Sequence, residues 1–272
     1  MKTSTKFGLW VLALFLLVGL VGPSFIELER TPDYDARFSP LSWAHPLGTD
    51  YAGRDVLAQL VHGAGDIFLI AFSAGAFAVL FAFLIGVGGA LAEGVTDTLL
   101  LGMTDIFLTV PSFPLMAILS ALFQVGDPIT FGLLLALWSW PGLARSLRSQ
   151  VLSLQHREFI EVCRLMCMGP WHILWREIFP NLIPYITLNF ILISRNAITA
   201  SVGIMMLGLV PLKVENWGMM LNLAAFQSGA IFLPQGMTYL MAPLLAIVLF
   251  QYSLILVASG VEELFDPRLR RG

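Results

Sequence analysis

The sequence of 272 residues has little charge, since Asp, Glu, Lys and Arg make up 12% of it. A soluble domain carries about twice that share. Two cysteines are too few for a disulfide framework, and a net charge of −3 gives no indication of nucleic-acid binding. Apolar residues are abundant instead: 57% of the chain is hydrophobic and the mean hydropathy is +0.82. The composition excludes a soluble globular domain and indicates a polytopic membrane protein.

The sequence also lacks the motifs of common catalytic and nucleotide-binding sites. It contains no G-x-x-x-x-G-K-[ST] loop, so we expect that the chain itself binds no ATP. Neither H-E-x-x-H nor G-x-S-x-G occurs, which argues against an intramembrane hydrolase. Cys163 and Cys167 lie near His156 and His172, but without the spacing of a zinc finger. We therefore expect no enzyme activity, no bound cofactor and no metal site.

Six apolar runs approach or exceed about 20 residues, the length that spans a bilayer as a helix. They are Phe7–Ile26, Ile67–Ala92, Leu99–Phe123, Ile129–Leu143, Leu182–Val210 and Met237–Ser259. The first ends without an A-x-A-like cleavage site, so we expect a retained anchor. The fourth is short, and we expect its helix to continue into the polar stretch that follows. The sequence thus predicts one all-α domain, residues 1–272, with six transmembrane helices.

The charges in the connecting segments set the expected orientation. If both ends of the chain are cytoplasmic, ten Lys and Arg residues lie inside and four outside, in agreement with the positive-inside rule. The external segment 27–66 and the internal segment 144–181 are too long for simple turns, and long connections are usually functional. A third segment, 211–236, is external and semi-apolar, and we expect it to lie along the membrane surface.

The internal segment has the pattern of two short amphipathic helices. On the first helix, one face holds Phe159, Val162, Cys163, Met166 and Cys167, and the other holds Arg157, Glu158, Glu161 and Arg164. After a break at Gly169-Pro170, a second apolar stripe holds Trp171, Leu174, Trp175 and Ile178. The pattern fits docking onto a partner, and it equally fits a position at the lipid interface.

The external segment contains a conspicuous string from His45 to Leu57. Its Gly48 suits a turn, Thr49 or Asp50 suits a helix N-cap, and a short helix should lead into the second span. The string His45-Pro46-Leu47-Gly48-Thr49-Asp50-Tyr51-Ala52-Gly53-Arg54-Asp55-Val56-Leu57 resembles a known signature. It is similar to the HPLGTDxxGRDVL motif of inner-membrane permeases of bacterial ABC importers for dipeptides, oligopeptides and nickel.

Three further segments resemble the same family, in the family's order. Glu161–Asn181 resembles its EAA loop, and Leu207-Gly208-Leu209 with Glu215–Leu221 resembles its LGLG…PEWGxML segment. The tail Phe265–Arg270 resembles the family's DPRLR-like ending. Together with the external string, these matches cover roughly residues 40–272.

The resemblance implies a permease that forms half of the pathway for peptides, nickel or other small solutes. Its loop Glu158–Pro180 would hold coupling helices that contact two cytoplasmic ATPase subunits, which bind ATP and Mg. The residues implied in this contact are Glu158, Glu161, Arg164, Gly169 and Trp171. A second permease subunit, giving a heterodimer, and a periplasmic or lipid-anchored binding protein would complete the importer. The external signature residues are His45, Gly48, Thr49, Asp50, Gly53, Arg54 and Asp55.

The chain departs from the family pattern at three places. Glu161-Val162-Cys163 replaces Glu-Ala-Ala, and Ser201 stands where many relatives carry glutamate. Cys167 occupies the family's glycine position, so we expect a displaced turn at Gly169-Pro170.

Arg195 is an unusual residue because it falls near the middle of the fifth apolar run. A charge at that depth is costly in lipid and should face protein or water. One interpretation is that Arg195, with Asn189 and Ser201, lines the translocation pathway and attracts an anionic group. The other is a structural contact with an acid or with carbonyl groups. A stand-alone ion-coupled secondary transporter is the alternative function, and it would place Asp105 and Arg195 in a coupling site.

Overall fold

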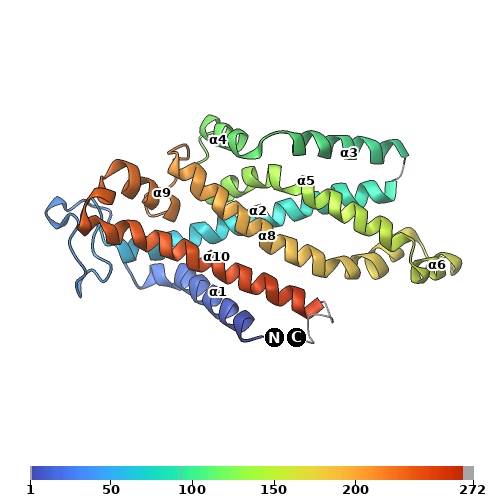
Figure 1. Cartoon of the computed structure of the whole chain (residues 1–272), viewed down its shortest axis with the longest axis horizontal. Helices are drawn as coiled ribbons and strands as arrows, with labels where there is room; N and C mark the ends of the chain where they lie inside the picture. The colour runs from blue at the N-terminus through green and yellow to red at the C-terminus, as the bar shows by residue number, and fades with distance from the viewer. Residues whose placement is uncertain (1, 93, 266–272) are drawn as a thin grey trace.

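The computed structural model describes residues 2–92 and 94–265, and within these ranges the chain is helical (Figure 1). There, the only extended pairing is an isolated bridge between Thr49 and Asp55, so the all-α class is confirmed. The long helices are α1 (Thr3–Val21), α2 (Val56–Ala92), α3 (Gly94–Thr109), α4 (Ser112–Leu122), α5 (Pro128–Gln155), α8 (Phe179–Met206) and α10 (Met237–Phe265). The short elements are η1 (Gly22–Ser24), η2 (Tyr34–Ala36), α6 (Glu158–Leu165), α7 (Pro170–His172), the π-helical η3 (Ile173–Ile178), α9 (Trp217–Asn222), the π-helical η4 (Leu223–Gln227), η5 (Ala230–Phe232) and η6 (Pro234–Gly236).

Helix α2 contacts most of the other long helices and packs closely against α5 through small residues. Every fourth residue from Ala74 to Ala90 is alanine or glycine, and all of them are buried. At Gly86 a Cβ atom would overlap the carbonyl oxygen of Ala144 in α5. Small residues let helix backbones approach, which increases dispersion contacts between helices in a membrane.

Helices α1 and α10 lie side by side, and the N-terminal end of α1 lies near the C-terminal end of α10 (Figure 1). Lys2 Nζ lies 2.7 Å from Glu263 Oε1, so the described ends of the chain share one end of the bundle. Helix α6 lies toward that same end, and the external loop 27–55 lies at the opposite end (Figure 1). The tail match from Asp266 onward falls outside the described residues.

The membrane-spanning helices differ from the six predicted ones. Four helical stretches of the described chain are long and apolar enough to cross a membrane, and they are Thr3–Ser24, Val56–Ala92, Pro170–Met206 and Pro234–Phe265. The predicted span Leu99–Phe123 is not one straight helix, because α3 and α4 meet at a bend of 86°. Pro111 stands at the bend, and a proline cannot donate the main-chain hydrogen bond that would continue the helix. This bent pair makes a fifth span if it crosses as one.

Two predictions about the polar internal segment have different outcomes. The fourth apolar run does continue as one helix, since α5 extends to Gln155. Its apolar part is short and is followed by Arg145 and Arg148, so α5 is not among the four apolar stretches. The second short amphipathic helix is not a separate element, because the chain stays helical from Pro170 to Met206. This helical stretch begins at Pro170, and proline suits the first turn of a helix because its missing N–H is not needed there.

Part of the segment 211–236 packs inside the bundle, and its position along the membrane surface stays a prediction. Helix α9 is buried between α2, α8 and α10, and Trp217 and Met220 are fully or almost fully buried. The indole N–H of Trp217 donates to the carbonyl oxygen of Leu60 in α2 (2.9 Å). The apolar character of α9 therefore reflects core packing, whereas Phe226 and Phe232 in the rest of the segment are exposed.

Candidate functional site: coupling segment, external loop and α8

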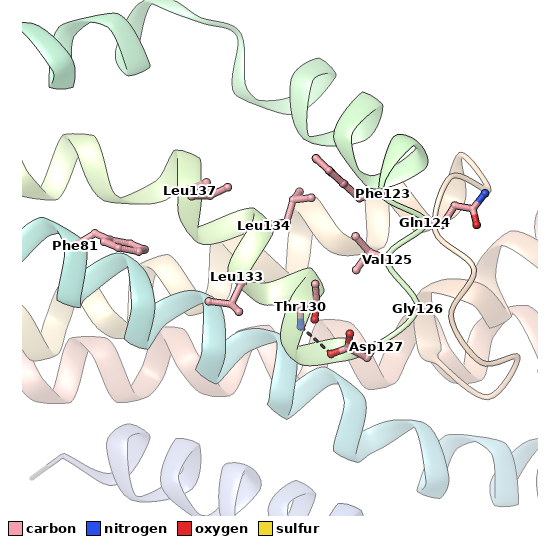
Figure 2. Close-up of a pocket in the computed structure, with 10 residues that line it drawn as sticks. All are labelled: Phe81, Phe123, Gln124, Val125, Gly126, Asp127, Thr130, Leu133, Leu134 and Leu137. Carbon is pink, nitrogen blue, oxygen red and sulfur yellow. Dashed lines mark hydrogen bonds between the residues drawn. The ribbon is translucent and has the colours of Figure 1, made fainter.

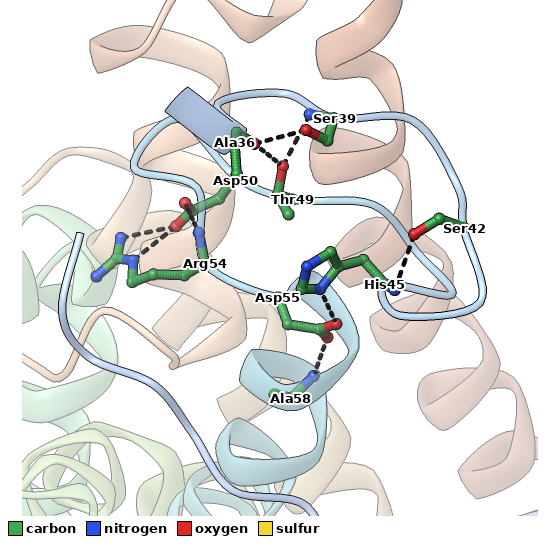
Figure 3. Close-up of polar contacts among 9 residues, drawn as sticks. All are labelled: Ala36, Ser39, Ser42, His45, Thr49, Asp50, Arg54, Asp55 and Ala58. Carbon is green, nitrogen blue, oxygen red and sulfur yellow. Dashed lines mark hydrogen bonds and ion pairs between the residues drawn. The ribbon is translucent and has the colours of Figure 1, made fainter. Parts of the chain in front are cut away.

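The external loop is built around the carboxylate of Asp50, which is fully buried (Figure 3). Its Oδ1 accepts hydrogen bonds from the main-chain N–H groups of Ala52 (2.8 Å) and Arg54 (2.9 Å). Its Oδ2 accepts from Arg54 Nε (2.9 Å) and Gln59 Nε2 (3.0 Å), and lies 2.7 Å from Arg54 Nη2. Burial alone would lower the pKa of Arg54, but the hydrogen bond and charge of Asp50 raise it. The carboxylate thus fixes the backbone of the loop through charge-assisted hydrogen bonds.

The glycines and the threonine of the signature serve the same loop. Gly48 and Gly53 have φ angles of +73° and +79°, which confirms the predicted turn at Gly48. A Cβ atom at Gly53 would overlap the carbonyl oxygen of Asp33. Thr49 Oγ1 donates to the carbonyl oxygen of Ala36 at 2.5 Å (Figure 3). These residues hold the stretch around Asp33 and Ala36 against the stretch from Thr49 to Gly53.

Asp55 starts helix α2. Its Oδ1 accepts from the main-chain N–H of Ala58 (2.8 Å), and its Oδ2 lies 2.8 Å from Nδ1 of His45 (Figure 3). The predicted N-cap at Thr49 or Asp50 is therefore wrong, since both of those side chains are engaged within the loop. The cap is a later residue of the same string.

Helix α6 is attached to the bundle by one face and presents the other. Ile160 is fully buried and packs in a cluster with Val151 of α5 and Ile178 of η3. On the other side, Leu165 is 84% exposed and Trp171 is 71% exposed. The charged residues Glu158, Glu161 and Arg164 are also exposed, as is Gly169. Within the described chain none of these three charged residues forms an ion pair. This exposed surface, called the coupling face below, is held rigidly but is unpartnered within the described chain.

The turn after α6 is located at Cys167, and the predicted displacement to Gly169-Pro170 is wrong. Cys167 has a φ of +56°, whereas Gly169 has a φ of −65°. The N–H of Cys167 donates to the carbonyl of Arg164 (3.0 Å) and that of Met168 to the carbonyl of Cys163 (3.0 Å). This hydrogen-bond pair is the Schellman motif, in which glycine is the usual left-handed residue. A cysteine thus occupies the left-handed position that glycine usually takes in this motif.

Cys167→Gly should therefore stabilise the coupling segment by about 1 kcal/mol, because a side chain in the left-handed region is strained. Hydrogen exchange of the amides in residues 163–169 should slow accordingly. Gly169→Ala serves as the control and should be neutral, since its φ suits any residue. Destabilisation by Gly169→Ala together with no gain from Cys167→Gly would contradict this assignment of the turn.

Two ion pairs fasten α3 to the internal half of α5. Arg148 donates from Nε to Asp97 Oδ1 (2.6 Å) and from Nη2 to Asp97 Oδ2 (2.5 Å). Arg145 pairs with Asp105. Asp105 is thus an ion-pair partner on the antiparallel helix, a role that sequence reasoning missed.

The three candidate pathway residues lie on α8 but in different surroundings. Asn189 and Arg195 are half-buried, and Arg195 Nε is buried without a hydrogen-bond partner. Ser201 is fully buried, and its hydroxyl donates to the carbonyl of Ile198 (2.8 Å). Asn189 and Arg195 are thus both partly accessible but lie about 120° apart around the helix, and Ser201 lies inside.

Sequence reasoning assigned no role to the residues that join α9 to its neighbours. Asn222 Nδ2 donates to the carbonyl of Met206 at the end of α8 (2.8 Å). Asn216 Oδ1 caps α9 through the N–H of Gly218 (3.0 Å), and Asn216 Nδ2 lies 3.4 Å from Asp66 Oδ2 of α2. The only signal for them was the resemblance of Glu215–Leu221 to a family segment, which named no contacts.

A pocket of about 520 Å³ opens between α2, α4 and α5 (Figure 2). Its walls are mostly apolar, with Phe81 and Phe123 on opposite sides. Its charged residue, Asp127, caps α5 by accepting from the N–H of Thr130 (2.8 Å), and hydrogen bonds from Thr130 lower the pKa of the carboxyl. In the described chain, no three His, Cys, Asp or Glu side chains gather as a metal site would require.

Comparisons with known proteins agree on one family. The sequence profile of the family described as "Binding-protein-dependent transport system inner membrane component" matches residues 64–271. A protein named as a peptide permease in Brucella suis biovar 1 (strain 1330) is 34% identical over 264 residues, which is 96% of this chain and 86% of the relative. The glutathione transport system permease protein GsiD of Pectobacterium atrosepticum is 32% identical over 250 residues, covering 90% of this chain and 79% of that protein. The oligopeptide transport system permease protein OppC of Bacillus subtilis (strain 168) is 26% identical over 270 residues, covering 97% and 85%. The chain therefore belongs to the binding-protein-dependent inner-membrane transport component family, and it is a permease subunit of an ABC importer.

Proposed function

We propose that this permease forms one half of a peptide pathway and is driven through its coupling face by separate ATPase subunits. The observation that carries the proposal is the continuous helix from Pro170 to Met206. It connects Trp171, at the exposed coupling face, with Arg195 at membrane depth. A rigid element of this kind converts a displacement at its cytoplasmic end into a movement of the pathway wall.

The proposed topology has six crossings, made by α1, α2, the bent pair α3–α4, α5, α8 and α10. Helix α5 has 28 residues and is thus about 42 Å long, more than the hydrocarbon core requires. Both ends of the chain and the coupling face would be cytoplasmic, and the Asp50 loop would face the periplasm. The ion pair between Lys2 and Glu263 supports a shared side for the two ends.

The proposed cargo is a peptide rather than nickel. The relatives named for their cargo carry the words peptide, glutathione and oligopeptide. The proposed partners are a second permease subunit, two ATPase subunits that hold ATP and Mg, and a periplasmic or lipid-anchored binding protein. The unpartnered coupling face supports an ATPase partner, since exposed apolar patches mark interaction surfaces.

Reconstitution tests this assignment. Liposomes with the two permeases, the ATPase subunits and the binding protein should accumulate a labelled tripeptide only when ATP is supplied on the ATPase side. Liposomes that contain this chain alone should accumulate none, with or without a proton or sodium gradient. Gradient-driven uptake by the lone chain would contradict the proposal and establish the secondary transporter instead.

A further inference from the structure

Polar side chains follow the accessible side of α8 through the part of the helix that lies at membrane depth. Asn189 and Asn196 are seven residues apart, so they lie on one face two turns from each other, and Thr199 follows three residues later. Asn196 and Thr199 are exposed, while Asn189 is half-buried. Gln251 of α10 extends this polar surface by donating from Nε2 to Thr199 Oγ1 (3.2 Å). Such a surface is unfavourable against lipid and is expected to face water or protein.

Arg195 borders this surface, and within residues 2–92 and 94–265 it forms no ion pair with an acid. The ion pairs found across residues 2–92 and 94–265 all involve other residues, and Nε of Arg195 is buried without a hydrogen-bond partner. From its position, Arg195 is roughly 24 Å from the start of α8 and 17 Å from its end. The rest of the half-buried guanidinium is accessible, and at this depth an anionic or strongly accepting partner lowers the free energy of the charge. The ion pairs of the described chain do not supply that partner, so a bound molecule can.

The polar surface of α8 ends at a contact with Phe113 near the C-terminal end of the helix. Phe113, just after the bend between α3 and α4, lies against Gly203 of α8, where a Cβ atom would be 3.1 Å from its ring. Asn189, Asn196 and Thr199 all lie on the cytoplasmic side of this contact. A molecule held by Arg195 would therefore extend from Arg195 toward the cytoplasmic half of α8.

The charge of Arg195 and the side-chain amides of Asn189 and Asn196 are chemically complementary to the C-terminal end of a peptide. The planar guanidinium of arginine binds a carboxylate through two parallel hydrogen bonds. Asparagine side chains both donate and accept, as main-chain peptide groups do. Asn189 Nδ2 donates to the carbonyl of Tyr185 (2.8 Å), which leaves Oδ1 and a second N–H for another partner. Asn189 is about 9 Å from Arg195 along the helix axis, the length of about three extended peptide residues, and about 120° from it around the helix. A peptide held by both residues would therefore cross the surface of α8 obliquely.

We propose that Arg195 binds the C-terminal carboxylate of the transported peptide, while Asn189 and Asn196 pair with its main chain. This inference rests on the proposed function and deepens it. Cargo with a free C-terminal carboxylate would be recognised inside the membrane, independently of the side chains of the peptide. No acidic residue lies among these polar residues of α8, so the peptide's amino terminus is not bound by this surface.

The test measures uptake of a free-acid tripeptide and of its C-terminal amide by the assembled importer in liposomes. Arg195→Gln should lower uptake of the free acid by at least tenfold and change uptake of the amide by less than twofold. The preference of the binding protein cancels, because each variant is compared with the wild type on the same peptide. Arg195→Lys should retain part of the free-acid uptake, since it keeps the charge but loses the planar fork. If the binding protein rejects the amide, equilibrium binding of both peptides to the purified permease–ATPase complex should give the same pattern.

Arg37→Gln is the matched control, because Arg37 is an exposed arginine in the external loop. Any effect of this control should be equal for the two peptides. An equal loss of both peptides in Arg195→Gln would overturn the inference and indicate a contact with the second permease. Unchanged uptake of both would overturn it as well. If the assembled wild-type importer took up neither peptide, the proposed function itself would fail, and the inference with it.

Discussion

Asp50→Asn is expected to destabilise the permease by about 3–5 kcal/mol, the cost of removing one partner from a buried ion pair. An asparagine could still accept from the main-chain N–H groups of Ala52 and Arg54 through its oxygen. Its amide nitrogen would then point at the donors of Arg54 and Gln59, which would lose their acceptor. The guanidinium of Arg54 would remain in a largely buried position without a counter-charge.

The measurement is the unfolding of the purified protein in mixed detergent micelles, followed by circular dichroism. Glu29→Gln is the matched control, since Glu29 is an exposed carboxylate in the same external loop and should change stability by less than about 0.5 kcal/mol. Asp55→Ala should fall between them at about 1 kcal/mol, because it removes the side chain that caps α2. If Asp50→Asn proved as stable as the wild type, the loop would not depend on this carboxylate.

Trp171→Ala is expected to uncouple the importer while leaving the permease folded. Trp171 is 71% exposed, so its side chain contributes little to the fold. An exposed tryptophan on an interface is typically worth about 2 kcal/mol or more, which corresponds to some 25-fold or greater in the dissociation constant. The affinity of the permease pair for the ATPase subunits should fall by that factor, and uptake should fall with it.

Trp43→Ala is the matched control at the other end of the molecule, since Trp43 is fully exposed in the external loop. It should leave the affinity for the ATPase unchanged. Ile160→Ala is a second variant, on the neighbouring helix α6, and the Ile160 side chain is buried. It should lower stability by about 2–5 kcal/mol through the cavity that it leaves. Normal ATPase binding and uptake in Trp171→Ala would contradict the role of the coupling face.

The sequence allowed prediction of the helical class and of a fourth apolar run that continues as helix into the polar stretch after it. These features depend on hydrophobic length and on charge, which are properties of the chain alone. The bend between α3 and α4 was missed because Leu99–Phe123 is apolar enough to be read as one span. Pro111 marked the place, but its effect depends on how α4 packs against α8.

The local geometry of the site was predicted less well, for reasons that individual residues make clear. Thr49 and Asp50 both have the chemistry of an N-cap, and only the buried contacts of Asp50 with Arg54 show that it serves the loop instead. Gly169 has the chemistry of a turn, yet the left-handed residue is Cys167, because the hydrogen bonds at the end of α6 fix that position. Arg195 was recognised from its depth alone, whereas its lack of an acid partner required the packed structure.

The cytoplasmic position of the coupling face is tested most directly by chemical labelling of Cys167. Cys167 is exposed and Cys163 is buried, and Cys163→Ala would leave Cys167 as the single cysteine. A membrane-impermeant maleimide should label this variant in inverted vesicles and not in right-side-out vesicles, and added ATPase subunits should protect it. Trp43→Cys in a Cys163→Ala, Cys167→Ala background should show the reverse sidedness. Labelling of Cys167 in right-side-out vesicles would place the coupling face outside the cell and contradict its contact with an ATPase.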